Sequence, residues 1–583
     1  MPAPFELHHL VRRGNLQRVR ELLRDRPPGQ GIDVNARDNR GYTALMHAVE
    51  SPKASVDLVH LLLEHGASVH QECPGFGTQH PMVALCLAGG DPRKLVALLE
   101  NGADIHYQRG EGYEAALIDA VHGRDVVRDP HLIDLLKLLI ARGVALNGVG
   151  RYQESGLRML SQVGRFDAVR LLLDAGADET QLDWTPLIRA VALGSLADVE
   201  KAVESGAYLE EKDWWSRSPW LVAIQTGDIA KARFLLEGGA DANARGCCEK
   251  PSLFHAIENH HTPMLEWLLE LGTAIEQKDD LGTTPLMTAV ECGNAEAVDV
   301  LLRAGADVNV ENHGQTAIGS AHTREIATRL LEAGADPGEL AFAGRRSLLG
   351  LDPEADEALL DVSLSEFHKG WSRRFGTRNP EKMVEPFWEG MIRAGVSASQ
   401  AGQLFGRQAT GSPVWCAQRF GQSLTFLPDG RIVQIAGEHE DYYDEDFCIY
   451  NDVLVHDPDG TIQIFGYPES VFPPTDFHTA TLAGEHIYIV GSMGYQGARQ
   501  YGMTPVYRLH TTSFRIEPVQ ARGEAPGWIS GHRALRTAAD EIRIFGGKIV
   551  TRDGDAETHT RNERSFILDT KRLVWRAAEN ETA

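Results

Sequence analysis

Apolar side chains along the first 340 residues follow the spacing of short amphipathic helices in a repeating unit. In the stretch TPLMTAVECGNAEAVDVLLRAGAD, Leu286 and Ala289 precede Val298, Leu301 and Leu302, so two helices each present one apolar face. Each unit ends in a leucine pair followed by Gly-Ala or a close variant, with its glycine at Gly66, Gly102, Gly143, Gly176, Gly206, Gly239, Gly272, Gly305 and Gly334. These glycines recur at a nearly constant interval, which predicts a helical repeat protein.

The repeat period, together with a Thr-Pro-Leu start, resembles the ankyrin repeat. The best unit, KDDLGTTPLMTAVECGNAEAVDVLLRAGADVN, begins at Lys278. We expect Thr284 to cap its first helix with Pro285 at the first helical position, and Gly305 to allow the positive-φ turn that ends the second helix. The resemblance implies an α-solenoid of about ten ankyrin repeats over residues 1–339, stabilised by the stacking of neighbouring units.

Residues 340–411 lose this pattern and are predicted to form a helical connector. One amphipathic helix is indicated by the helical spacing of Leu364, Phe367, Trp371 and Phe375. A second helix is expected to start with Asn379 as its N-cap and to bend at Pro386, because an internal proline removes a helix hydrogen bond.

From about residue 412 the apolar period changes from 3.6 to 2, which predicts short strands. Three segments share the order strand, tight turn, strand, glycine: LTFLPDGRIVQIAG, TATLAGEHIYIVGS and ALRTAADEIRIFGGK. Each is followed by a second predicted hairpin. Gln422, His478 and His532 align in the three segments and are separated by two nearly equal intervals.

This β-rich repeat is similar to the kelch repeat, whose period is about 50 residues. The glycine pair Gly546 and Gly547 and the later Trp575 carry the resemblance best. It implies an all-β partial propeller of about three four-stranded blades over residues 412–583. The fold is therefore predicted to be multidomain, with an α-solenoid, a helical connector and a kelch-like segment.

Charge and cysteine content restrict the classes of partner. The 583 residues carry a formal net charge of −25, which opposes binding to nucleic acid or to an anionic membrane and favours a basic protein partner. Seven cysteines without a C-x-x-C pair give no disulfide framework or zinc ribbon. The start MPAPFELHHLVRRGN lacks the apolar stretch of a secretory signal, so a cytoplasmic location is expected.

No residue pattern indicates a metal or organic cofactor. The kelch class includes a copper oxidase, and copper sites need converging imidazole and thiolate or phenolate ligands. His478 and His532 occupy the same repeat position, so a propeller would place them in different blades. No nucleophile, base and orienting acid lie close together in the sequence. An oxidase-like or hydrolase-like site in the propeller is the alternative to a non-enzymatic function.

Both resemblances imply a scaffold or adaptor that binds a protein partner. Ankyrin repeats present hairpin tips, and the predicted partner-binding residues at these tips are Asn39, Arg40, Trp214, Trp215, Asp280, Leu281 and His313. Trp214 and Trp215 are notable because tryptophan is enriched among interface hot spots. The alternative is that they fold back onto a neighbouring tip. Three blades cannot close a ring, so the segment is expected to pair with a second copy or to be covered by the connector or the last ankyrin repeats.

Overall fold

The computed structural model describes residues 6–24, 32–38, 40–73, 82–88, 91–109, 115–122, 124–150, 152, 154–335, 340–407, 413–439, 447–554 and 556–578. The chain divides into two compact units, Met1–Ala306 and Asp307–Ala583, called unit 1 and unit 2 below. The predicted repeat that ends in Gly334 therefore lies in unit 2. Within the described ranges, every helix is too short or too polar to cross a bilayer.

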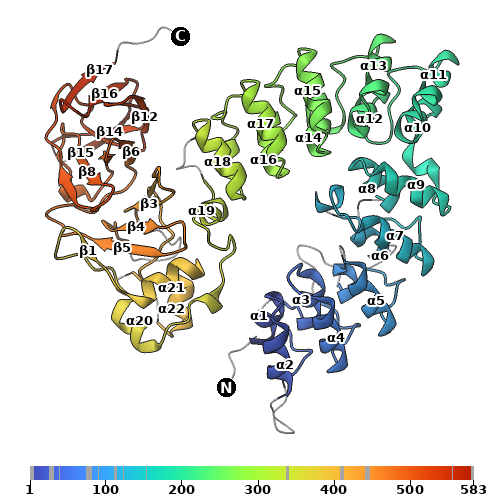
Figure 1. The fold of residues 1–583 in the computed structure, drawn as a ribbon, viewed down its shortest axis with the longest axis horizontal. Helices are drawn as coiled ribbons and strands as arrows, with labels where there is room; N and C mark the ends of the chain where they lie inside the picture. The colour runs from blue at the N-terminus through green and yellow to red at the C-terminus, as the bar shows by residue number, and fades with distance from the viewer. Residues whose placement is uncertain are drawn as a thin grey trace. The chain divides into compact units, whose positions relative to one another are not determined.

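Unit 1 is built from short helices that pack in consecutive pairs (Figure 1). The helices are α1 (Glu6–Arg12), α2 (Leu16–Arg24), α3 (Ala44–Glu50), α4 (Val56–Glu64), α5 (Pro92–Glu100), α6 (Ala115–Ala120), α7 (Leu132–Ala141), α8 (Gly156–Gln162), α9 (Phe166–Asp174), α10 (Pro186–Leu193), α11 (Leu196–Glu204), α12 (Pro219–Thr226), α13 (Ile229–Glu237), α14 (Ser252–Glu258), α15 (Thr262–Glu270), α16 (Pro285–Glu291) and α17 (Ala295–Arg303). A 3₁₀ turn at Ala84–Leu87 precedes α5 in place of a full helix.

The repeat register predicted from the sequence is present in these pairs. The Thr284 side chain accepts a hydrogen bond from the Met287 backbone N–H, and Pro285 occupies the start of α16. Leu235, Leu268 and Leu301 follow one another at the repeat interval and are fully buried at the same place in successive pairs. This recurrence shows that the same apolar helix face is buried in each successive pair, as stacking requires.

The repeat glycines end the second helix of each pair by their backbone conformation. All nine have φ between 78° and 98°, including Gly305 at 92°. A Cβ at any of them would meet nothing within 4 Å, so the requirement for glycine is conformational and not spatial.

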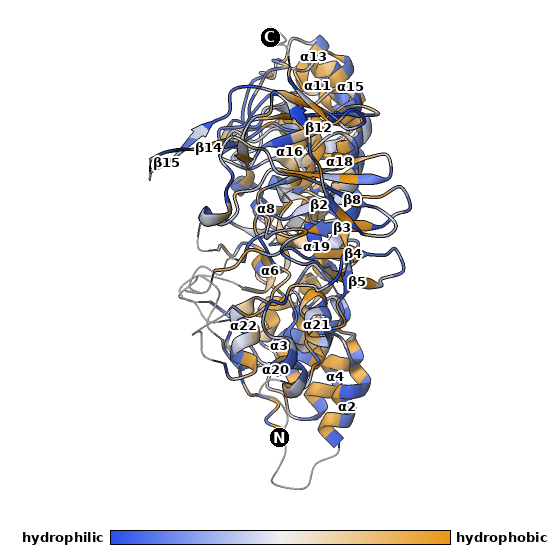
Figure 2. Ribbon diagram, turned by 90° about the vertical axis from the view of Figure 1, so that its left-hand side faces the viewer, coloured by the Kyte–Doolittle hydropathy of each residue, from blue (hydrophilic) through white to orange (hydrophobic). Residues whose placement is uncertain are grey.

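The exposed helices show the expected division between apolar and polar faces. Hydrophobic residues alternate in patches with hydrophilic ones along α2 and α4 (Figure 2). The hydrophobic faces contribute to one continuous core between Leu7 and Leu182 that includes Leu58 and Leu62 of α4. Burial of these faces between pairs supplies the stability that a single pair cannot provide.

Unit 2 begins with helices and continues into sheets. Its helices are α18 (Arg324–Glu332), α19 (Phe342–Leu348), α20 (Leu364–Gly370), α21 (Pro386–Ala394) and α22 (Ala398–Leu404). A helix begins at Leu364 as predicted, capped by Ser363, whose side chain and that of Glu366 form a capping box. It ends at Gly370, so Trp371 and Phe375 lie beyond the helix that was predicted to include them. Trp388 of α21 stacks on Trp415 at 4.9 Å between ring centroids, which joins the connector to the first sheet.

The prediction that a helix begins at Asn379 is wrong. Proline at an N-terminal helical position starts a helix well, and α21 begins at Pro386 and is not bent there. The residues before it form a short strand, because Glu381 and Lys382 pair with Gly466 and Phe465. The connector thus adds a strand to the sheet that follows it.

The strands of unit 2 form four separate sheets in the described part of the chain (Figure 1). They are β1 (Glu381–Lys382), β2 (Ser423–Phe426), β3 (Ile432–Ile435), β4 (Val453–His456), β5 (Ile462–Gly466), β6 (Thr479–Ala483), β7 (His486–Val490), β8 (Val506–His510), β9 (Ile516–Pro518), β10 (Arg522–Gly523), β11 (Trp528–Ser530), β12 (Arg533–Ala538), β13 (Glu541–Phe545), β14 (Lys548–Asp553), β15 (Ala556–Arg561), β16 (Phe566–Asp569) and β17 (Val574–Ala577). The sheet orders are β1-β5-β4-β3-β2, β6-β7-β8-β9, β10-β17-β16-β13-β12 and β11-β14-β15.

Three of these sheets repeat one pattern of four antiparallel strands. Gln422, His478 and His532 each directly precede the first of the four repeated strands, β2, β6 and β12, which agrees with the alignment made from the sequence. The third sheet departs from the pattern because the hairpin β14–β15 is inserted between its second and third strands and pairs with β11. The C-terminal region is therefore β-rich and repetitive, in several sheets.

Candidate binding sites

The first predicted tip is held by a carboxylate. Asp38 Oδ1 accepts hydrogen bonds from the backbone N–H groups of Arg40 and Tyr42, each at 2.9 Å, and its Oδ2 lies 2.8 Å from His47 Nε2. Arg40 is exposed on this turn. Asn39 lies outside the described residues.

Trp214 and Trp215 are half-buried against neighbouring repeats and do not project freely. The backbone N–H of Trp214 donates to the carbonyl of Leu182 at 3.4 Å, and the Arg158 guanidinium lies 5.1 Å from the centroid of the Trp214 indole ring. The two indole rings are 5.0 Å apart. Trp214 thus contacts the preceding repeats, and Trp215 contacts Trp214.

Backbone hydrogen bonds continue this contact from tip to tip. The Cys247 N–H donates to the Trp215 carbonyl at 3.3 Å, and the Asp280 N–H donates to the Cys248 carbonyl at 3.1 Å. We call this series, from Leu182 to Asp280, the finger ladder. It fixes successive tips of unit 1 in register.

The remaining predicted tip residues are exposed. Asp280 is exposed at the end of the finger ladder, and Leu281 beside it is 66% exposed. Asp279 Oδ1 accepts from the backbone of Leu281 and Thr283, which holds the turn. His313 is also exposed, with φ of 50°, but it belongs to unit 2.

A buried ion pair supports the turn that carries the two tryptophans. Arg217 and Asp213 are both fully buried, and the guanidinium Nε lies 2.9 Å from Asp213 Oδ2. Arg217 also donates to the carbonyl and hydroxyl of Ser161 and to the side-chain oxygen of Gln225. Every charged atom is thereby paired, which a buried guanidinium requires.

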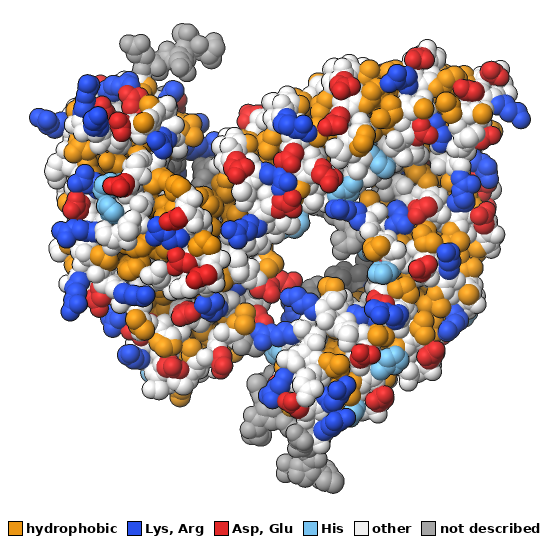
Figure 3. Space-filling view, viewed as in Figure 1, with side chains coloured by type: hydrophobic (Ala, Val, Ile, Leu, Met, Phe, Trp, Pro, Cys, Tyr) orange, Lys and Arg blue, Asp and Glu red, His pale blue; other side chains and the backbone are white. Residues whose placement is uncertain are grey.

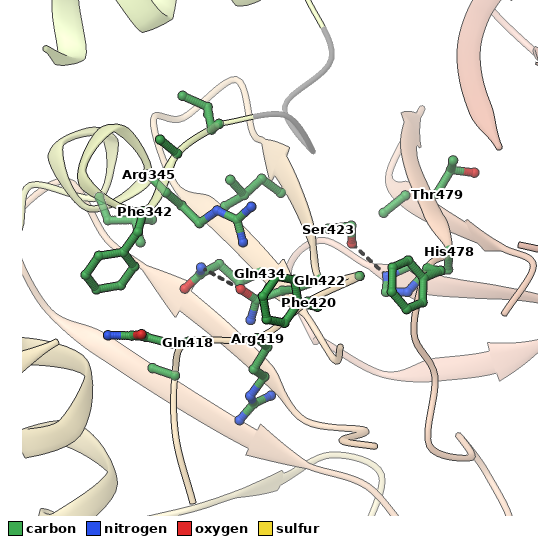
Figure 4. A pocket seen from close by; sticks show the side chains of 18 of the residues that line it. Phe342, Arg345, Gln418, Arg419, Phe420, Gln422, Ser423, Gln434, His478 and Thr479 are labelled. Atoms are coloured by element: carbon green, nitrogen blue, oxygen red, sulfur yellow. Dashed lines mark hydrogen bonds between the residues drawn. The ribbon is translucent and has the colours of Figure 1, made fainter. Parts of the chain in front are cut away.

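Unit 2 contains a pocket of about 1270 Å³ that sequence reasoning did not identify (Figure 4). One wall comes from α19 and the end of the last helical repeat, and the opposite wall comes from β2, β6 and β12. These are the first strands of the three repeated sheets. Figure 4 shows Arg345 reaching from α19 toward Gln422 and Gln434.

Two histidines of the pocket connect successive sheets. His478 Nε2 lies 2.8 Å from Ser423 Oγ, and His532 Nε2 lies 2.9 Å from Thr479 Oγ1. Each histidine therefore bonds to the residue that begins the first strand of the preceding sheet. Burial lowers the pKa of His478 to about 3 and that of His532 to about 4, so both are neutral at physiological pH.

Arg345 is the unusual group of this pocket. It has no hydrogen bond or ion pair among the described residues, its Nε is buried, and burial lowers the pKa of its guanidinium. By contrast, Arg346 donates to the carbonyls of Asp352, Ile392 and Arg393. The described residues that line the pocket include no Asp or Glu.

A thiol and an imidazole also meet at the pocket wall. Cys416 Sγ lies 3.1 Å from His439 Nδ1, and Tyr450 Oη lies 3.3 Å from the same nitrogen. Burial raises the pKa of Cys416 to about 12, so the sulfur is a protonated thiol at neutral pH. A reactive cysteine requires the thiolate, which this environment disfavours.

The site could be predicted from the sequence only in part. The alignment of Gln422 with His478 and His532 identified the repeat position that lines the pocket. Arg345 lies in the stretch FAGRRSLL, which carries no signal that separates it from Arg346. Only the tertiary structure shows that one of these arginines is paired and the other is not.

The charged surface is mixed in sign on the face drawn in Figure 3. Lys and Arg side chains are interspersed with Asp and Glu there, without a continuous basic area.

Comparison with known proteins identifies the helical repeats. Residues 6–73 and 253–340 match the family model described as ankyrin repeats, in three copies. E3 ubiquitin-protein ligase KEG of Arabidopsis thaliana is 24% identical over 333 residues, which is 53% of this chain and 20% of the relative. B-cell lymphoma 3 protein homolog of Mus musculus is 31% identical over 169 residues, 27% of this chain and 38% of the relative.

Ankyrin repeat protein nuc-2 of Neurospora crassa is 29% identical over 183 residues, 30% of this chain and 17% of the relative. The chain therefore spans between 17% and 38% of the length of these three relatives. The ankyrin repeats predicted from the sequence are confirmed by the family model and the relatives. Both stretches matched by the family model end at or before residue 340. The β-rich region that follows is therefore described from the structure and not from this match.

Proposed function

We propose that this protein is a non-enzymatic scaffold or adaptor that binds a protein partner through the tips and concave face of its ankyrin repeats. The observation that carries the proposal is the finger ladder, which holds consecutive tips in register and leaves Asp280 and Leu281 exposed. A rigid surface with an apolar side chain beside a carboxylate suits a basic partner, as does the net charge of −25. The described cysteines are free thiols, which supports a cytoplasmic location.

Leu281→Asp tests the tip surface directly. Wild-type and variant chains are used to capture partners from a lysate, and recovered proteins are quantified by mass spectrometry. A partner that contacts the tips should be recovered about tenfold less by the variant, because the substitution puts a charge into an apolar contact. The matched control is Leu271→Asp, on a leucine that is also exposed, at the end of α15. Equal loss from both variants, or from neither, would contradict the proposal.

Trp214 and Trp215 have a second, structural part in this surface. Because the Trp214 ring lies against Arg158 of a preceding repeat and contacts the Trp215 ring, Trp214→Ala with Trp215→Ala should weaken partner binding mainly by loosening the finger ladder. Calorimetric titration of the captured partner measures the affinity. Unchanged affinity in the double variant would show that neither the two tryptophans nor the finger ladder contributes to the proposed site.

We also propose that the three repeated sheets are kelch-type blades. In each, the residue after the second strand has a positive φ: 51° at Ala436, 78° at Gly491 and 66° at Gly546. Gly546 and Gly547 match the kelch glycine pair, and the other two sheets have Ala-Gly and Gly-Ser at these positions. The kelch-like segment would be a second binding or self-association module.

Whether two such segments pair to form a ring is decided by molecular mass. Within unit 2, α19 lies across the pocket from the first strands of the three sheets, so the chain itself occupies part of their open side. We therefore propose that the protein is a monomer in which α19 covers the open side of the sheets, and not a homodimer. Light scattering coupled to gel filtration should give a mass near 64.1 kDa. Twice that mass, lost on deleting residues 412–583, would establish the homodimer.

An enzymatic function is the second candidate, because Cys416 and His439 meet at the pocket wall. The name of one relative, an E3 ubiquitin-protein ligase, describes a protein of which this chain matches 20%. The raised pKa of Cys416 argues against a nucleophilic thiolate. Rapid alkylation of Cys416 by iodoacetamide at pH 7 in the native protein would favour the enzyme; resistance until unfolding would favour the scaffold.

A further inference from the structure

The pocket of unit 2 carries an inference that is independent of the tip surface. Its starting point is the unpaired guanidinium of Arg345. Arg345 is half-buried, with its Nε fully buried, and an arginine withdrawn from water without a partner is costly. Proteins keep such a group where a ligand supplies the opposite charge. Two other arginines of the pocket are paired: Arg346 bonds three carbonyls, and Arg419 bonds both carboxylate oxygens of Asp452.

The composition of the pocket points to the sign of the ligand. The chain has 82 acidic residues against 57 basic ones, yet no described residue that lines the pocket is acidic. The pocket is therefore electropositive within a strongly acidic protein. An anion would find there a guanidinium whose planar donors match carboxylate and phosphate oxygens.

A second donor faces the same cavity. Gln422 is 5% exposed, and its Oε1 accepts a hydrogen bond from Gln434 Nε2 at 3.1 Å. Its own Nε2 is buried without an acceptor. Gln422 holds the position that His478 and His532 use to bond the preceding sheet, and in the first sheet no preceding sheet exists. The first sheet is thus left with a donor that a ligand can satisfy.

The rest of the lining is suited to an apolar group. Phe420 and Leu535 line the pocket and are 48% and 50% exposed, and Phe342 of α19 lies at its wall. A volume of about 1270 Å³ exceeds the usual range of about 300 to 1,000 Å³ for small-ligand pockets, so space does not exclude an organic molecule.

We propose that this pocket binds a small organic anion, with its carboxylate or phosphate head held by Arg345 and Gln422 and its apolar part against Phe420 and Leu535. The shared chemistry is an oxyanion on an apolar body. The two head groups are distinguished by experiment.

The test uses the full chain and three probes that share an aromatic ring: 3-phenylpropionate, phenyl phosphate and the neutral 3-phenylpropionamide. Isothermal titration calorimetry should show at least one anion binding about tenfold more tightly than the amide. The tighter of the two anions identifies the head group. Failure of both anions to bind at about 10 mM, or equal binding of the amide, would overturn the proposal.

Two variants and one control locate the binding. Arg345→Met should reduce anion affinity about tenfold or more and leave amide binding unchanged. Gln422→Glu is nearly isosteric and still accepts from Gln434, but it places a carboxylate in the pocket and should exclude the anion. Arg324→Met removes an exposed arginine of α18 and should change nothing. Anion binding that survives both pocket variants would place it elsewhere.

The thermal midpoint of each free variant gives a readout that does not depend on the ligand. Arg345→Met removes a half-buried charge that has no partner among the described residues, so its unfolding midpoint should equal or exceed that of the wild type. A lowered midpoint would show that Arg345 serves the fold and would count against the proposal. Partner capture by the Leu281 tip should be unaffected by Arg345→Met, which separates this inference from the proposed function.

Discussion

The helical repeats and the sheets both use glycine at a repeated position, but for different physical reasons. In the helical repeats, represented by Gly305 at φ 92°, a Cβ would meet nothing within 4 Å. In the third sheet, Gly547 has φ of 77°, and a Cβ there would lie 2.6 Å from the Ser530 carbonyl oxygen. The helical repeat needs only a turn that ends its helix, whereas the turn of the third sheet is also packed on neighbouring backbone.

The two regions also differ in how they treat an arginine that is withdrawn from solvent, fully in Arg217 and in part in Arg345. Arg217 in unit 1 bonds Asp213, Ser161 and Gln225, and its charge is fully compensated. Arg345 in unit 2 has no such partner among the described residues. The first arginine supports the structure of a tip, and the second is available to a ligand.

The largest expected effect comes from breaking the compensated pair. Arg217→Met leaves Asp213 ionised and buried without its partner, and should cost about 3 to 5 kcal/mol in the free energy of unfolding. Chemical denaturation followed by tryptophan fluorescence measures this, because Trp214 and Trp215 lie on the same turn.

A second substitution checks the cause of that loss. Asp213→Asn removes the charge, while the amide oxygen can still accept from the backbone of Trp215 and of residue 217. Added to Arg217→Met, it should recover about 1 to 3 kcal/mol. A further loss in the double variant would show that the cost is one of packing and not of an unpaired charge.

An intermediate effect separates the two uses of glycine. Gly305→Ala should cost about 1 kcal/mol, since only the positive φ is unfavourable for alanine. Gly547→Ala should cost about 2 to 3 kcal/mol, because the methyl group also meets backbone that cannot move without disturbing the sheet. Both costs are measured by denaturant unfolding of the full chain. Equal costs for the two variants would show that the close approach of backbone to Gly547 has no effect on stability.

The features that could be predicted from the sequence are those that depend on interactions between residues close together in the chain. The regular spacing of the repeat glycines and the alignment of Gln422, His478 and His532 depend on local pattern, and both agree with the structure. The predicted helix start at Asn379 was wrong, because this stretch can begin a helix by local rules but Glu381 and Lys382 pair instead with a distant strand, β5.

The binding sites depend on contacts between distant segments, and so were predicted only in part. Exposure of Trp214 depends on Arg158 and Leu182 from the preceding repeats, which no local pattern reveals. The pocket depends on Arg345 and Gln422, which come from a helix and a sheet far apart in the chain. In both cases the residue types were visible in the sequence and their partners were not.

The smallest expected effect is a pH dependence that belongs to the sheets. The pKa of His478 is about 3 in the folded protein against an ordinary value of 6.5, because burial disfavours the charged ring, as does the neighbouring His532. Between these values the unfolded chain binds a proton that the folded chain does not, so stability falls as the pH is lowered from about 6.5. From pH 7 to 5.5 this should amount to about 1 kcal/mol. His478→Gln takes the residue that the first sheet has at Gln422 and should reduce the loss of stability from pH 7 to 5.5 by about 1 kcal/mol, as measured by denaturant titration at each pH. Other buried histidines with lowered pKa values, His532, His456 and His255, keep the rest of the slope. His313→Gln, the same change at an exposed turn of unit 2, is the control and should keep the wild-type slope. If His478→Gln keeps the wild-type slope as well, the acid sensitivity of the folded state lies outside the contact between His478 and Ser423.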